Sequence, residues 1–370
     1  MNTKKKREKT VLVLQGGGAL GAYQAGAAAT LEESGQYADW VAGISIGAIN
    51  AALIAGNAPE KRTEILRAFW KRITAITSMS VPFFGFFGHQ AFNIASATST
   101  MMLGAPGFFK PRFPPPSCQF PGTIGATSYY DTSGLRETLL EFVDFELLNS
   151  GKTRFSVGAV NVATGNMTWF DNAHQTIRPE HVMASGALPP GFPAVEIDGE
   201  FYWDGGLVSN TPLQYVLDDQ FGSDDLCVFQ IDLFNARGPV PRSILSIDAR
   251  EKDIRFSSRT RFNTDMMKRL HQTRDAARRL YDKLPKELRD DPDARALVVG
   301  NADPRVSIVH LIYRQAKYEG GSKDYEFSRS SMIQHWDAGQ SDTRYTLEHP
   351  EWRKRNESRE RVQVFDLSCH

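Results

Sequence analysis

The most constraining stretch of this sequence is Trp40 to Asn50, which reads WVAGISIGAIN. An apolar segment ends in the spacing Gly43-x-Ser45-x-Gly47, and an alanine-rich segment follows. This order predicts a strand, a sharp turn and a helix, the arrangement that exposes a serine hydroxyl at the carboxyl end of a sheet. Glycines suit the flanking positions because side chains there would collide with the neighbouring strand or helix. We therefore expect Ser45 to be a nucleophile, although an ordinary tight turn between a strand and a helix would show the same pattern.

A second strand–loop–helix unit precedes this stretch. Residues 11–14 (VLVL) form a short, wholly apolar segment, residues 15–21 (QGGGALG) are rich in glycine, and residues 22–34 are rich in alanine. A β-α-β-α opening of this kind predicts a parallel sheet with a right-handed crossover. The glycine loop and the turn at Ser45 should then lie side by side at the carboxyl edge of the sheet, where ligands bind in such folds.

The glycine loop has two interpretations. Gly16-x-Gly18-x-x-Gly21 fits a dinucleotide-binding fingerprint, with Asp39 at a suitable distance along the chain. However, Asp39 precedes the second predicted strand, whereas the acid that binds a ribose follows it. The alternative is an oxyanion hole, in which consecutive N–H groups of Gly16, Gly17 and Gly18 point toward the Ser45 hydroxyl. We favour the oxyanion hole.

A serine becomes a nucleophile only when a base accepts its proton. His174, His181 and His310 are the plausible histidines by neighbourhood, but none lies in a turn that marks a member of a triad. Asp204 is a better candidate, since it follows the aromatic residues 201–203 (FYW) and precedes Gly205 and Gly206. A carboxylate can act as a base only where loss of water raises its proton affinity. On its own, Asp-Gly-Gly would favour a plain turn.

Taken together, these motifs resemble those of the patatin-like phospholipase family. The matching segments are residues 16–21 (GGGALG), 43–47 (GISIG), 184–189 (ASGALP) and 204–206 (DGG), in the family's order. The resemblance implies a three-layer α/β/α sandwich around a mainly parallel sheet. It also implies a dyad of Ser45 and Asp204 that hydrolyses lipid acyl esters with neither a metal nor a cofactor. In this resemblance the oxyanion loop contains Gly16, Gly17, Gly18 and Gly21, and Gly17 and Gly18 supply its N–H groups. The glycines with structural roles are Gly43, Gly47, Gly205 and Gly206. The family usually has Arg or Lys where this chain has Leu20.

Composition excludes several other classes of protein. The 43 basic and 43 acidic residues cancel, so no global charge favours nucleic acid as a partner. Cys118, Cys227 and Cys369 are far apart, which argues against a disulfide framework and favours a reducing compartment. The sequence contains no run of 18 apolar residues, so it predicts no transmembrane helix. We expect a cytoplasmic protein with a basic tail at residues 1–10. We further expect that it can contact the inner membrane peripherally.

The remaining sequence predicts three regions. Residues 11–236 should form the acyl hydrolase domain, interrupted at 81–130 by an insertion rich in Phe, Gly and Pro that we expect to be irregular. Phe83, Phe84, Phe86 and Phe87 in that insertion could line an acyl channel or contact lipid. Residues 237–370 should form a mostly helical extension of unknown role, similar to that of some bacterial family members. It contains a charged helical pattern at 249–284, an apolar strand at 306–313 and a helix at 328–338.

The sequence therefore predicts a serine acyl hydrolase whose substrate is a lipid or a lysophospholipid, with an acyl-enzyme intermediate. One alternative is a catalytically silent, membrane-associated scaffold that binds lipid, although such a protein would need to keep neither Ser45 nor Asp204. The other alternative is a dinucleotide-binding oxidoreductase, which the position of Asp39 disfavours.

Overall fold

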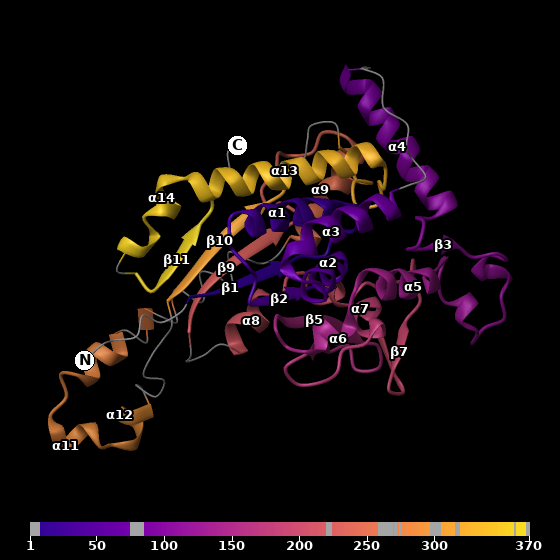
Figure 1. Cartoon of the computed structure of the whole chain (residues 1–370). Helices are drawn as coiled ribbons and strands as arrows, with labels where there is room; N and C mark the ends of the chain where they lie inside the picture. The colour runs from indigo at the N-terminus through magenta and orange to yellow at the C-terminus, as the bar shows by residue number, and fades with distance from the viewer. Residues whose placement is uncertain are drawn as a thin grey trace.

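A nine-stranded sheet runs through the middle of the molecule (Figure 1). The computed structural model of the chain describes residues 8–74, 85–219, 224–257, 269, 272–273, 276–296, 305–314, 319–358 and 360–367. Most strand pairs are parallel, and the antiparallel pairs all lie at the end of the sheet that contains β5 to β8. The strand order is β11-β10-β9-β1-β2-β5-β8-β7, with β6 paired to β5. The strands are β1 (Glu8–Leu14), β2 (Trp40–Gly43), β5 (Arg154–Asn161), β6 (Met167–Asp171), β7 (Val195–Ile197), β8 (Glu200–Asp204), β9 (Asp225–Asp232), β10 (Val306–Ile312) and β11 (Val362–Phe365).

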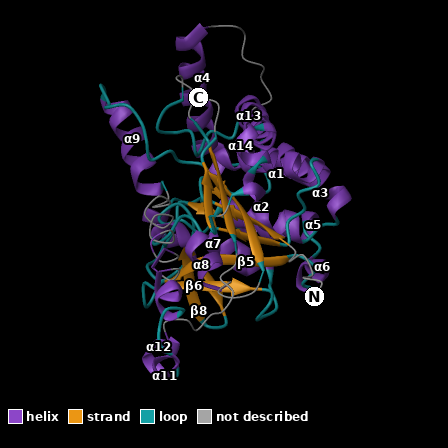
Figure 2. Ribbon diagram, turned by 90° about the vertical axis from the view of Figure 1, so that its left-hand side faces the viewer, coloured by secondary structure: helices purple, strands orange, loops and turns teal. Residues whose placement is uncertain are grey.

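Helices cover both faces of this sheet, as the view turned by 90° shows (Figure 2). Side chains alternate along β1, so that Leu12 and Leu14 enter the larger hydrophobic cluster and Val11 and Val13 the smaller one. The larger cluster includes residues of α1 (Gly21–Glu33), α2 (Ile46–Ala55), α3 (Pro59–Ile73), α5 (Ser133–Phe142), α7 (Pro179–Ser185) and α13 (Arg329–Glu348). The smaller cluster includes residues of α8 (Leu213–Asp219). The predicted α/β/α sandwich with a mainly parallel sheet is confirmed.

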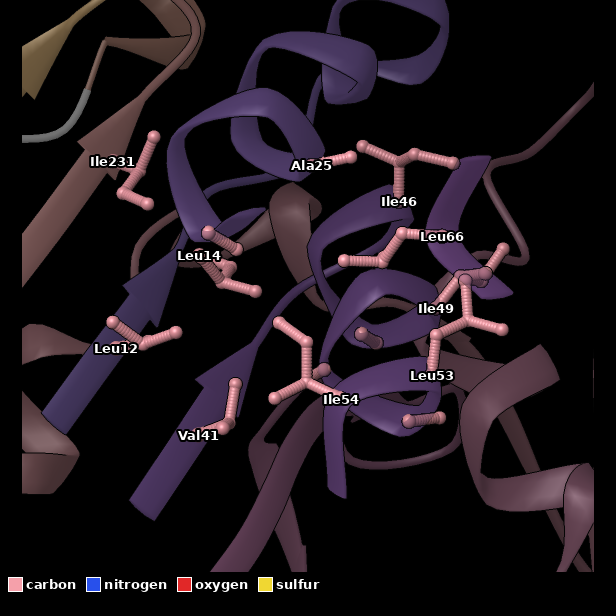
Figure 3. Packing of buried hydrophobic residues seen from close by; sticks show 14 of the residues in the cluster. Leu12, Leu14, Ala25, Val41, Ile46, Ile49, Leu53, Ile54, Leu66 and Ile231 are labelled. Atoms are coloured by element: carbon pink, nitrogen blue, oxygen red, sulfur yellow. The ribbon is translucent and has the colours of Figure 1, made fainter. Parts of the chain in front are cut away.

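The β-α-β-α opening places the two predicted site loops next to each other. Strand β1 pairs in parallel with β2, and the register sets Leu14 opposite Gly43. The glycine loop and the turn at Ser45 therefore leave the sheet at the same edge. Figure 3 shows side chains of β1, β2 and α2 packed together in the core beneath this edge, among them Leu14, Val41 and Ile54. The sequence-based prediction of this arrangement is confirmed.

The insertion is more regular than the sequence indicated. Helix α4 occupies Gly85–Leu103, so the expectation that residues 81–130 are irregular is wrong for this segment. Residues 89–103 contain neither proline nor glycine, which permits a helix after the glycines at the start. The rest of the insertion consists of a short pair of strands, β3 (Lys110–Pro111) and β4 (Tyr130–Asp131), with turns between them. Phe83 and Phe84, and the side chains of Phe86 and Phe87, lie outside the described residues.

The C-terminal region does not form a separate appendage. Strands β10 and β11 extend the central sheet beyond β9, and β11 was absent from the sequence-based prediction. Helix α13 continues to Glu348, ten residues beyond the predicted end, and crosses α1 closely (Figure 1). A Cβ atom added at Gly339 would lie 2.1 Å from the carbonyl oxygen of Tyr23 in α1. In this region α9 (Ile244–Phe256), α11 (Lys286–Arg289) and α12 (Pro292–Ala296) precede α13. Of the predicted helical pattern at 249–284, residues 249–256 and 276–281 are helical, and residues 258–268, 270–271 and 274–275 lie outside the described residues.

The remaining short helices are α6 (Phe145–Asn149) and α14 (Pro350–Arg353). Within the described part of the chain, no helix combines the length and the apolar character needed to cross a membrane. Helix α3 buries Phe69 and Ile73, whose spacing of four residues places them on one face of the helix.

Candidate active site

Ser45 occupies a strained backbone conformation between β2 and α2. Its φ of 56° and ψ of −123° lie in a region that residues other than glycine rarely adopt. Such strain persists only when the surrounding structure holds it, and it gathers at functional sites. The neighbouring glycines permit the turn, because a Cβ atom at Gly43 would lie 2.3 Å from the Gly47 carbonyl oxygen. A Cβ atom at Gly47 would lie 2.3 Å from the Leu14 carbonyl oxygen.

Ser185, at the end of α7, holds this turn from the other side. Its hydroxyl accepts a hydrogen bond from the Ser45 N–H at 3.0 Å and donates one to the Gly158 carbonyl oxygen of β5 at 2.7 Å. Ser185 is fully buried, so it links three elements in the core of the site. Ser185 lies in the ASGALP segment, but reasoning from the sequence alone gave it no role.

Asp204, at the end of β8, lies against the Ser45 side chain and is 2% exposed. Its carboxylate accepts a hydrogen bond from the Gly206 N–H at 2.7 Å. Burial raises the pKa of the Asp204 carboxyl to about 7, and hydrogen bonds from the Ser45 side chain and the Gly206 N–H oppose this rise. Gly205 allows β8 to approach β5, since a Cβ atom there would lie 2.6 Å from the Gly158 carbonyl oxygen. A carboxylate with a pKa near 7 can accept a proton from a neighbouring hydroxyl.

The glycine loop presents two N–H groups beside this pair. The Gly16 N–H donates to the Asn210 carbonyl oxygen at 3.2 Å, and the Gly21 N–H donates to the Gly18 carbonyl oxygen. The N–H groups of Gly17 and Gly18 have no hydrogen-bond partner within the described part of the chain. Four glycines were predicted for the oxyanion loop, and these bonds leave Gly17 and Gly18 as the donors available to a ligand.

The other two glycines of the loop have packing roles. A Cβ atom at Gly16 would lie 2.4 Å from the Asn210 side-chain oxygen. One at Gly21 would lie 2.5 Å from the side chain of Ile46. Leu20, where the family usually has a cation, is fully buried in the hydrophobic core. The loop is therefore packed closely on both sides.

A cavity of about 380 Å³ opens beside Ser45 and Asp204. Rings from distant parts of the chain pack together along its wall, with 5.3 Å between the centroids of Phe109 and Phe192 and 5.9 Å between those of Phe108 and Phe327. The aromatic residues that line the cavity are Phe108, Phe109, Tyr129, Tyr130, Phe192, Phe234, Phe256, Tyr325 and Phe327. The cavity therefore has a polar corner at Ser45 and Asp204 and an aromatic wall.

The three histidines considered from the sequence lie elsewhere. His181 accepts a hydrogen bond from the Arg178 N–H at 2.8 Å and packs beside Phe170, and its burial lowers its pKa. His174 is exposed in the turn after β6, and His310 is buried on β10. Among the described residues that line the cavity there is no histidine.

Sequence reasoning missed Asn210 and Asp324, which both line the cavity. The Asn210 amide donates to the carbonyl oxygens of Gly16 at 3.1 Å and Phe256 at 2.9 Å, so it connects the glycine loop to the end of α9. Asp324 lies beside the glycine loop although more than 300 residues separate the two in the sequence. No local pattern marks either residue, since each acts through a contact between distant segments.

Two family models match this chain. Residues 12–217 match the family model described as patatin-like phospholipase, and residues 254–359 match one described as patatin phospholipase. A curated relative, the cGAMP-activated phospholipase of Pseudomonas aeruginosa strain BWHPSA011 / Pa011, is 34% identical over 94 residues, which are 23% of this chain and 28% of the relative.

Similar solved structures include VipD from Legionella pneumophila, with a TM-score of 0.34 and 15% identity, covering 90% of this chain and 67% of that one. Another is ExoU, in complex with SpcU, from the type III secretion system of Pseudomonas aeruginosa, with a TM-score of 0.31 and 14% identity, covering 67% of this chain and 49% of that one. The match to residues 12–217 spans more than half of the 370 residues. This chain therefore belongs to the patatin-like phospholipase family, a family of lipid hydrolases.

Proposed function

We propose that this protein is a serine acyl hydrolase that cleaves carboxylic ester bonds of lipids or lysophospholipids through a dyad of Ser45 and Asp204. One observation carries the proposal: a serine in a strained turn is hydrogen-bonded to a buried carboxylate whose pKa is about 7. Strain and a raised pKa at one place are features of catalytic sites rather than of structural turns.

In the proposed reaction each of these groups has one role. The Asp204 carboxylate accepts the hydroxyl proton of Ser45 while the serine oxygen bonds to the ester carbon. The negative charge that develops on the carbonyl oxygen is stabilised by the N–H groups of Gly17 and Gly18. The protonated Asp204 then gives its proton to the departing alcohol as the ester bond breaks. Water hydrolyses the resulting acyl-enzyme by the same steps, with Asp204 again acting as the base.

The wall of the cavity favours a long apolar acyl group. Phe109 lies among the rings of Phe108, Tyr130, Phe192 and Phe327, with centroids 5.0 to 6.1 Å apart. Burial of an acyl chain against these rings removes apolar surface from water, worth about 0.8 kcal/mol for each methylene. This binding energy is available only to substrates long enough to reach the rings.

We also propose that the entrance contacts a lipid surface. Met101 and Tyr129 line the cavity and are themselves 45% and 58% exposed, and Phe113 and Phe120 in the same insertion are 94% and 83% exposed. Exposed apolar side chains gain by entering the boundary of a bilayer. Replacing Phe113 and Phe120 with serine should weaken binding to phospholipid vesicles, whereas Phe201→Ser on β8 should leave it unchanged.

We also propose that the protein resides in the cytoplasm. Cys118 and Cys227 are free thiols, which supports a reducing compartment such as the cytoplasm.

Labelling with a fluorophosphonate and a panel of esters tests the proposal. Wild-type protein should be labelled at Ser45, because only an activated serine reacts, and should hydrolyse esters with a preference for long acyl chains. A folded wild-type protein that binds vesicles but is neither labelled nor active would instead support the silent scaffold. Labelling that NAD or NADP blocks would favour the dinucleotide-binding interpretation.

A further inference from the structure

A segment of the C-terminal region, residues 319–327, contacts the glycine loop directly. The Ala19 N–H donates a hydrogen bond to the Asp324 carbonyl oxygen at 2.8 Å. Gly18 has a φ of +55°, and a Cβ atom there would lie 2.2 Å from the same oxygen. Only a glycine fits at this contact. Ala19 comes directly after Gly17 and Gly18, whose N–H groups are free. Because Asp324 holds the backbone of Ala19, its position influences the direction in which these two N–H groups point.

Lys252 of α9 holds the 319–327 segment in this place. Its ammonium group donates to the Gly321 carbonyl oxygen at 2.7 Å, to the Asp324 carboxylate at 2.8 Å and to the Tyr325 hydroxyl at 2.5 Å. An ammonium has three donors, so all three are used on one segment. The side chains of Lys252 and Asp324 are only 16% and 14% exposed, which limits screening by water.

We propose that Lys252 is a positioning residue for the oxyanion hole. It fixes the backbone of Asp324, which in turn fixes Ala19 and the N–H groups of Gly17 and Gly18. The C-terminal region is thus part of the catalytic machinery and not only an extension of the sheet. This inference rests on the proposed serine hydrolase reaction, in which those N–H groups stabilise the oxyanion.

The segment has a second anchor that should keep it folded when Lys252 is changed. The Lys323 ammonium pairs with the Asp253 carboxylate of α9 at 2.6 Å, and its side chain is 2% exposed. Loss of Lys252 should therefore loosen the contact at Asp324 without releasing the segment. Removal of one oxyanion donor lowers turnover about 100- to 1,000-fold, so partial misplacement of two donors should cost about 10- to 100-fold in kcat.

The test compares Lys252→Met, Lys252→Arg and the control Arg255→Met with the wild type. Arg255 lies three residues further along α9, is 66% exposed and pairs only with Glu251 of the same helix among the described residues. The readouts are kcat and KM for p-nitrophenyl butyrate, and inhibition by an alkyl trifluoromethyl ketone, which forms an oxyanion when a serine adds to it. The matching secondary alcohol cannot form an oxyanion and reports binding to the cavity alone.

We expect Lys252→Met to lower kcat about 10- to 100-fold with KM changed less than about two-fold. The inhibition constant of the ketone should rise by a similar factor, while that of the alcohol stays constant. Lys252→Arg should recover much of the lost kcat, because it keeps the charge, and Arg255→Met should behave as the wild type. A purely structural role would instead reduce the number of sites titrated by a fluorophosphonate and leave turnover per site unchanged.

Two results overturn the role of Lys252 but leave the proposed hydrolase function standing. The first is a folded Lys252→Met enzyme with wild-type kcat, and the second is a Lys252→Met enzyme that loses equal affinity for the ketone and for the alcohol. Should Lys252→Met not fold, Asp324→Asn decides the question, since it keeps the backbone carbonyl and weakens only the ion pair. It must show the same selective loss of affinity for the ketone. A wild-type protein that neither hydrolyses the ester nor binds the ketone overturns the proposed function, and this inference with it.

Discussion

Replacing Asp204 with asparagine should inactivate the protein and, at alkaline pH, stabilise it. The pKa of this carboxyl is raised from 3.8 to about 7 because burial disfavours its charged form. In the unfolded chain the Asp204 carboxyl loses its proton near the ordinary pKa. Between pH 4 and 7 the folded state therefore binds this proton more tightly than the unfolded state does. The stability that this proton contributes is complete below about pH 4 and is lost as the pH rises through 7.

The size of the effect follows from the same two values. One pKa unit corresponds to about 1.4 kcal/mol, so above pH 7 the ionised Asp204 costs the fold up to about 4 kcal/mol. Asparagine carries no charge and keeps an oxygen for the Gly206 N–H, which now donates to the carboxylate at 2.7 Å. For a chain of this length the gain in Tm should reach roughly 5 °C at pH 8. It should shrink steadily toward zero at pH 4.

Thermal melting of wild type and Asp204→Asn at pH 4, 5, 6, 7 and 8 measures this difference. Asp218→Asn, at an exposed position, is the matched control and should show no such trend. Ester hydrolysis is measured on the same samples and should be lost in Asp204→Asn alone. A difference in Tm that is constant across this pH range, or a less stable Asp204→Asn at pH 8, would refute the reasoning that burial raises this pKa.

Further predictions concern the nucleophile, the base, the cavity and the packing of α13. Ser45→Ala should lower turnover about a million-fold while the melting profile shows a folded protein; substantial activity would exclude the nucleophile. Wild-type kcat/KM should fall about ten-fold per pH unit below pH 7, as Asp204 takes up its proton, and a flat profile to pH 5 would exclude this base. Phe109→Ala should lower kcat/KM about ten-fold or more for long acyl chains and little for butyrate, whereas an equal fall for both would mean a role in the core only. Gly339→Val should cost about 1 to 3 kcal/mol of stability because its Cβ would lie 2.1 Å from a backbone oxygen of α1, and Gly320→Ala, with open space around it, should cost little.

Short-range features of this protein could be predicted from the sequence. The turn at Ser45 is marked by a local pattern, because a Cβ atom at Gly43 would lie 2.3 Å from the carbonyl oxygen of Gly47 in the same turn. The alternation of apolar segments with glycine loops and alanine-rich helices was enough to predict the parallel opening and the shared sheet edge. Asp204 was a candidate because it ends an aromatic segment and precedes two glycines, and the family's motifs favoured it over a plain turn.

Contacts between distant segments could only be decided by the tertiary structure. Asp204 reaches Ser45 because β8 pairs antiparallel with β5, which sets Asp204 opposite Ala159. Its burial at this position removes the carboxyl from water and raises its pKa. Ser185, Asn210 and Asp324 enter the site through hydrogen bonds to elements far away in the chain. Strand β11 is short and gains its stability from the neighbouring β10, so its own residues carry little signal. The sequence by itself determined the local turns and the order of the elements, whereas burial and long-range hydrogen bonding, which depend on how those elements pack, determined the chemistry of the site.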